Sequence, residues 1–178
     1  DTINLAAGMP VGSTIIYGAY GNSGGGEIGG DEFGEEITYG DVNNDGFKDV
    51  ATAMHHNYST SDFGNQLIEV ALGNGSGNNW TPYDDGLATN GEYYGMFGVD
   101  MADVNNDGLL DVGANSFGFG AGLHIYKNNG NGTWTQTDGV LGGNAKHWAK
   151  FGDFNRDGKV DLATANEWGV IWSNDGTG

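Results

Sequence analysis

The chain has 178 residues and a net charge of −18, because 24 Asp and Glu face only 6 Lys and Arg, and it contains 35 glycines, 2 prolines and no cysteine. The charge argues against nucleic acid as a partner, and no apolar run approaches the ~20 residues of a membrane span, so neither nucleic-acid binding nor membrane insertion is expected. The aromatic content of 12% favours a folded core over disorder, and that core has no disulfide support.

In chain order, the first predicted strand covers 13–20, inside a stretch (1–26) that precedes the repeated part of the sequence. Three units of similar pattern follow, at approximately 27–87, 88–141 and 142–178. Each unit opens with a short strand, at 36–39, 97–101 and 148–151. An acidic loop comes next and leads into a strand of small and β-branched residues, at 49–53, 111–115 and 161–165.

A third, apolar strand is predicted in every unit, at 67–72, 123–127 and 170–173. The first two units continue into a fourth strand, at 80–83 and 133–137. Four short strands in each unit are the content of a β-propeller blade. The sequence shows no capped helix, so the fold is predicted to be all-β.

The acidic loops share one motif, D-x-N-x-D-G-x-x-D, which begins at Asp41, Asp103 and Asp153. Oxygens from the side chains at positions 1, 3, 5 and 9 and from the backbone carbonyl at position 7 can converge on one point, and Gly at position 6 permits the reversal of the chain. Hard cations such as Ca²⁺ bind about 6–8 oxygens of this kind. We therefore expect three Ca²⁺ sites, with these ligands: Asp41, Asn43, Asp45, Phe47 and Asp49; Asp103, Asn105, Asp107, Leu109 and Asp111; Asp153, Asn155, Asp157, Lys159 and Asp161.

An ordinary turn is the alternative for these loops, because Asn-Asp-Gly is also a hairpin sequence. That alternative does not account for the aspartates at positions 1 and 9. An EF-hand would place Glu at position 12 and continue as a helix, whereas the sequence has Thr52, Ala114 and Thr164 there, without helical periodicity. Each loop is therefore predicted to join two strands.

The loops, the Phe151-Gly152 pair before the third loop and the small-residue strands after all three resemble FG-GAP/VCBS repeats, the calcium-bearing blades of integrin α-subunit propellers. Similar repeats occur in secreted microbial proteins and in some fungal lectins. The resemblance covers about residues 27–178. It implies an all-β domain over 1–178 that is built from four-stranded antiparallel β-propeller blades, three of which are recognisable.

Three blades are fewer than the about 4–8 of a typical propeller, and the third unit lacks its fourth strand. The chain is therefore expected to be part of a larger propeller or to be completed by other copies of itself. The open strand edge of the third unit is a candidate for self-association, and the strand in 1–26 is a candidate to close that edge, in the same chain or in a neighbour.

The loops at the opposite end of each unit from the acidic loops contain aromatic, His, Asn and Glu residues. Such residues suit a sugar, because rings stack on its C–H face and polar groups bind its hydroxyls. Packing between blades is the alternative role for each aromatic residue. The candidate ligand-binding residues are His55, His56, Tyr58, Tyr93, Tyr94, Asn115, His147, Trp148, Asn166, Glu167 and Trp168.

These features favour an extracellular, calcium-stabilised binding or adhesion module, secreted or at the cell surface, whose ligand is a glycan or an extracellular protein. The extracellular location is expected because calcium sites of this kind are filled there. One alternative is a structural subunit of a filament or surface assembly. Another is an enzyme acting on polysaccharide, a lyase or hydrolase with His147, Tyr58 or Glu167 as acid or base.

Overall fold

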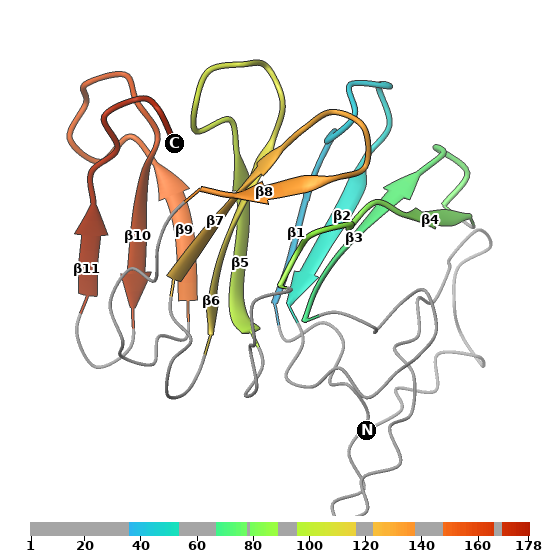
Figure 1. Cartoon of the computed structure of the whole chain (residues 1–178), viewed down its shortest axis with the longest axis horizontal. Helices are drawn as coiled ribbons and strands as arrows, with labels where there is room; N and C mark the ends of the chain where they lie inside the picture. The colour runs from blue at the N-terminus through green and yellow to red at the C-terminus, as the bar shows by residue number, and fades with distance from the viewer. Residues whose placement is uncertain are drawn as a thin grey trace, which may run out of the picture.

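The computed structural model describes residues 36–53, 67–77, 79–88, 96–116, 123–137, 148–165 and 169–178. In these ranges the regular structure consists of strands only, and they form three antiparallel sheets (Figure 1). The described residues include no helix with the length and apolar character to cross a membrane. The predicted all-β class of propeller-like blades is confirmed.

Each sheet takes its strands from consecutive positions in the chain, and we call the sheets blades 1, 2 and 3. Blade 1 contains β1 (Glu36–Gly40), β2 (Asp49–Ala53), β3 (Ile68–Gly73) and β4 (Trp80–Pro82). Blade 2 contains β5 (Met96–Ala102), β6 (Asp111–Ser116), β7 (Leu123–Asn128) and β8 (Trp134–Gln136). Blade 3 contains β9 (Trp148–Gly152), β10 (Asp161–Ala165) and β11 (Gly169–Trp172).

The acidic loop occupies the same place in all three blades, between the first and second strands. The pairs that close it are Gly40 with Asp49, Ala102 with Asp111, and Gly152 with Asp161. The last aspartate of every motif is therefore also the first residue of the second strand. The loop has the same length in all three blades and is closed by an equivalent strand pair.

The blades lie side by side, so that their first strands are neighbours: β1 packs beside β5, and β5 beside β9 (Figure 1). A close approach requires glycine at this point. A Cβ on Gly98 of β5 would lie 2.7 Å from the backbone nitrogen of Ala149 in β9. Gly98 therefore allows the first strands of blades 2 and 3 to meet.

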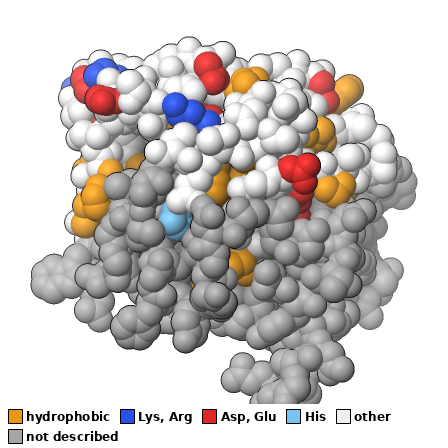
Figure 2. Space-filling model, viewed as in Figure 1, with side chains coloured by type: hydrophobic (Ala, Val, Ile, Leu, Met, Phe, Trp, Pro, Cys, Tyr) orange, Lys and Arg blue, Asp and Glu red, His pale blue; other side chains and the backbone are white. Residues whose placement is uncertain are grey.

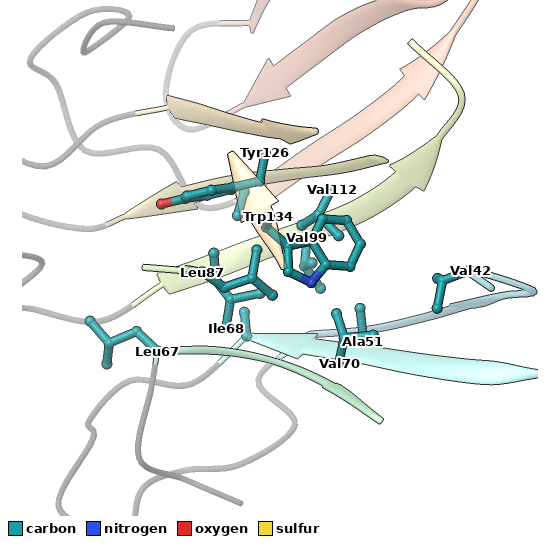
Figure 3. Close-up of a cluster of buried hydrophobic side chains, with 12 residues drawn as sticks. Val42, Ala51, Leu67, Ile68, Val70, Leu87, Val99, Val112, Tyr126 and Trp134 are labelled. Carbon is teal, nitrogen blue, oxygen red and sulfur yellow. The ribbon is translucent and has the colours of Figure 1, made fainter. Parts of the chain in front are cut away.

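The larger hydrophobic core fills the space between blades 1 and 2. Ala51, Ile68 and Val70 of blade 1 face Val99, Val112, Tyr126 and Trp134 of blade 2, with Leu87 beside them (Figure 3). A smaller core lies between blades 2 and 3, where Val104, Leu123 and Ile125 meet Ala149 and Leu162. Burial of apolar surface between blades is therefore the main packing interaction of this structure.

The described part of blade 3 has three strands, in the order β11-β10-β9. The predicted strand at 13–20, and with it the closing role proposed for 1–26, lies outside the described residues. The unit boundaries near 27, 88 and 142 also lie outside them and stay predictions.

The close contact at Gly98 gives a direct test of the packing between blades 2 and 3. Gly98→Ala should lower the free energy of unfolding by about 1–3 kcal/mol, because the added methyl group meets backbone atoms that cannot move independently. Gly169→Ala is the matched control, since a Cβ there has no other atom within 4 Å. Urea denaturation measures both variants, and equal stability of the two would contradict the packing.

Candidate functional site

The three acidic loops lie at the same end of the three blades, connecting β1 to β2, β5 to β6 and β9 to β10 (Figure 1). Figure 2 shows acidic side chains along this upper side of the molecule. The backbone of the loops is equivalent: position 4 has a positive φ in each, at Asn44 (59°), Asn106 (60°) and Arg156 (64°). Position 6 is always a glycine with φ between 82° and 89°. A Cβ on these glycines meets no other atom within 4 Å, so the conformation and not the space selects glycine.

Hydrogen bonds within each loop follow the same pattern, as the first loop illustrates. Asp41 at position 1 accepts from the backbone amides of Asp45 (3.0 Å) and Gly46 (2.9 Å). Asn43 at position 3 accepts from the amide of Asp45 and donates to its carboxylate. Asp45 at position 5 accepts from the amide of Phe47 at 2.8 Å. The second and third loops repeat these contacts, so the side-chain oxygens of positions 1, 3 and 5 all turn toward the interior of the loop.

The aspartate at position 9 is fully buried and holds two segments together. Asp111 accepts from the amide of Val104 (3.0 Å), at position 2 of its own loop, and from the amide of Asn128 (2.9 Å), at the end of β7. Asp49 and Asp161 make the equivalent pair of contacts in blades 1 and 3. The sequence assigned the aspartates at positions 1 and 9 to calcium alone, whereas the structure shows for both a role that needs no metal.

Burial makes the ionised form of the position-9 carboxylate costly. The pKa of Asp111 is raised to about 6, mainly by desolvation; the amides of Asn128 and Val104 partly offset this rise, and the charges of Asp107 and Asp103 add to it. Burial also raises the pKa of Asp49, which the amides of Val42 and Gly73 partly offset. A positive charge in these loops would favour the ionised carboxylates.

The donor set fits a calcium ion by its chemistry. Each loop supplies three carboxylates, one amide oxygen and a backbone carbonyl, all of them hard oxygen ligands. Among the described residues, no group of three His, Asp or Glu side chains is arranged as a metal site, and the loop carboxylates instead accept hydrogen bonds from backbone amides. The side chain at position 7 covers a glycine of the third-to-fourth strand turn, as Phe47 does at Gly75 and Leu109 at Gly130. Only the backbone carbonyl of position 7 is therefore a candidate ligand.

Two asparagines that the sequence reasoning missed connect the first and second loops to the following blades. Asn128 of blade 2 donates through Nδ2 to the carbonyl of Val42 in the first loop (2.7 Å), and Asn174 of blade 3 donates to the carbonyl of Val104 in the second (2.7 Å). Each also accepts from the amide of the glycine two residues later. The recurring Asn-x-Gly sequence after the third strand was the available signal.

Two of the candidate ligand-binding residues are described, and neither lies in a loop. Asn115 lies within β6, is fully buried, and its Nδ2 donates to the carbonyl of Trp148 at 2.7 Å. Trp148 is the first residue of β9, and its side chain is 56% exposed. The structure therefore joins these two residues in a contact between blades 2 and 3. The other candidates, His55, His56, Tyr58, Tyr93, Tyr94, His147, Asn166, Glu167 and Trp168, lie outside the described residues.

Antiparallel blades that carry the same acidic loop between their first and second strands define a β-propeller-type repeat protein. The family model for the FG-GAP-like repeat matches this chain over residues 41–114 and 115–164, more than half of its length. The chain belongs to the FG-GAP-like repeat family. A search among curated proteins found no match to it.

The two kinds of aspartate in one loop should respond differently to substitution when calcium is absent. Asp111→Ala leaves the buried amides of Val104 and Asn128 without their acceptor, which costs about 1–3 kcal/mol for each amide. Asp107→Ala removes an exposed side chain, and water can replace its hydrogen bonds. Urea denaturation in EGTA should therefore show a large loss for Asp111→Ala and little change for Asp107→Ala. Similar losses in the two variants would contradict the structural role of position 9.

Proposed function

We propose that this chain is an extracellular binding or adhesion module whose blades are stabilised by three calcium ions. Family membership is consistent with a binding or adhesion-type module. The observation that carries the proposal is the threefold recurrence of one loop geometry, with positive φ at positions 4 and 6 and with oxygen side chains at positions 1, 3, 5 and 9. The carboxylates at positions 1, 5 and 9 already bind backbone amides, and the proposal adds a cation as a further partner of the same oxygens.

In the first loop the ligands would be Asp41, Asn43, Asp45 and Asp49, with the carbonyl of Phe47, and the equivalent residues would serve in the other two. A bound calcium ion supplies positive charge and oxygen coordination and no group-transfer chemistry. The first and second loops also contact the following blades through Asn128 and Asn174. An ion that held these loops in place would therefore also stabilise the contacts between blades. The proposed role of calcium is therefore architectural.

Calcium should raise the melting temperature of the protein, and EGTA should reverse the effect. At a free concentration one hundred times the dissociation constant, each site contributes about 2.7 kcal/mol. The exposed aspartates at position 5 allow each site to be removed separately, with Asp45→Asn, Asp107→Asn and Asp157→Asn. Isothermal titration calorimetry should count three ions in the wild-type protein, two in each single variant and none in the triple variant.

Asp85→Asn is the matched control, because Asp85 is an exposed aspartate outside the loops, and this variant should retain three ions. The titration must extend to millimolar calcium, since extracellular modules bind with dissociation constants of about 10⁻⁴–10⁻³ M. Absence of binding heat and of any shift in melting temperature under these conditions would remove the calcium sites from the proposal.

The ligand that we propose is a glycan, bound at the end of the blades opposite to the acidic loops. The support is the composition of the sequence segments between β4 and β5 and between β8 and β9, where Tyr93, Tyr94 and His147 offer stacking rings and hydrogen-bonding groups. The alternative ligand is an extracellular protein, which would use the same aromatic residues.

A glycan array followed by calorimetry with the best sugar tests the ligand. Tyr94→Ala should weaken sugar binding at least tenfold, a loss of about 1.4 kcal/mol, with no change in melting temperature. Thr81→Ala is the control, because Thr81 is an exposed residue of β4 outside the proposed site. Unchanged affinity in Tyr94→Ala, or no sugar bound by the wild-type protein, would exclude this glycan site and leave the calcium sites untouched.

A further inference from the structure

We propose that, in the 178-residue chain, the exposed face of blade 3 binds the exposed face of blade 1 of a second copy. The proposal is independent of the calcium sites and of the glycan. It rests on a comparison of equivalent positions in the three blades. In blades 1 and 2 the equivalent face packs against the following blade, which shows what kind of surface can cover it.

Register identifies the equivalent positions. Val70, Ile125 and Ile171 lie opposite Ala51, Gly113 and Ala163 in their sheets. Position 2 of the acidic loop is Val42, Val104 and Phe154 in the three blades. These two sets mark the face of each blade that points toward the next blade along the chain.

In blades 1 and 2 this face is buried. Val42 and Val70 belong to the core that blade 2 completes, and Val104 and Ile125 belong to the core that blade 3 completes. In blade 3 the equivalent Phe154 and Ile171 are 46% and 58% exposed. Hydrophobic side chains are visible at the margin of the molecule on the side of β11 (Figure 2). This face of blade 3 therefore carries the same kind of apolar residues that blades 1 and 2 use to pack against the following blade.

A shallow hollow of about 420 Å³ lies on the same face. Trp148 and Lys150 of β9, Ala163 of β10 and Ile171 of β11 line it. Ala163 is equivalent to Ala51 and Gly113, the positions against which the following blade packs in the two covered interfaces. The hollow therefore lies where a further blade would pack.

The complementary face is exposed on blade 1. Ile37 and Tyr39 of β1 are 58% and 71% exposed. The equivalent residues of blade 2, Val99 and Met101, pack against blade 1, and those of blade 3, Ala149 and Phe151, pack against blade 2. One chain thus displays both halves of an interface that it already forms twice internally.

These two faces lie at opposite ends of the row of blades (Figure 1), so contact between copies is head-to-tail. Head-to-tail contacts generate a ring when the rotation closes and a longer assembly when it does not. Two copies would contribute six blades, within the range of about 4–8 for closed propellers. The net charge of −18 on each copy opposes association, so added salt should strengthen it by screening the repulsion.

Sedimentation equilibrium of the 178-residue chain over a concentration series tests the proposal. The wild-type mass should rise from the monomer to at least twice that value, at lower concentration in high salt. Ile171→Lys and Tyr39→Lys should each remain monomeric, because each places a charge on one of the two faces. Thr81→Lys on the exposed surface of β4 adds the same charge elsewhere and should associate as the wild-type protein does.

A mixture of the Ile171→Lys and Tyr39→Lys variants separates this arrangement from other dimers. Each variant keeps the face that the other has lost, so the mixture should form a heterodimer through one interface although neither variant associates alone. A symmetric contact of like faces, or pairing through the free edge of β11, would instead leave one single variant able to associate. That result, or a wild-type protein that stays monomeric at all concentrations, would overturn the proposal, while unchanged circular dichroism confirms that the variants fold.

Discussion

The structure depends on one buried carboxylate in every blade. The position-9 aspartate begins the second strand, bonds the amide at position 2 of the loop and bonds the amide at the end of the third strand, as Asp111 does with Val104 and Asn128. Three segments of one blade therefore meet at a single side chain that is inaccessible to water. A buried amide without an acceptor is expensive, so the loop cannot change its conformation without a cost to the sheet behind it.

The contacts between blades use the same segments. Asn128 donates to the first loop while its own amide bonds Asp111, so one residue connects the position-9 carboxylate of its blade with the loop of the preceding blade. The first strands are joined in a related way: Glu36 of β1 accepts from the amide of Val99 in β5, and Asp100 of β5 accepts from the amide of Phe151 in β9. Carboxylates thus accept hydrogen bonds from amides of β5 and β9, which are edge strands in the described sheets, and these bonds link neighbouring blades.

The repeated sequence was sufficient to predict the strands of the described ranges and the place of the acidic loops. Strand bounds moved by one or two residues, as for β5, which begins at Met96, and β8, which is confined to Trp134–Gln136. The sequence could not reveal the contact of Asn115 with Trp148, because the two residues are 33 positions apart and meet only through the packing of two blades. The roles of Asn128 and Asn174 were hidden for the same reason, since asparagine near glycine is an ordinary turn signal in a chain of this composition.

The hydrogen bonds of the loop carboxylates and the proposed coordination of calcium do not exclude one another. A carboxylate has about four lone-pair sites, and the position-9 aspartate uses one site on each oxygen for a backbone amide. The carboxylate at position 1 likewise accepts one amide on each oxygen, as Asp41 does from Asp45 and Gly46. Both groups therefore keep acceptor capacity for a cation while the amides hold their orientation. The amide network fixes the direction of these oxygens, and a divalent ion bound in the proposed way would reduce the repulsion among the carboxylates of one loop.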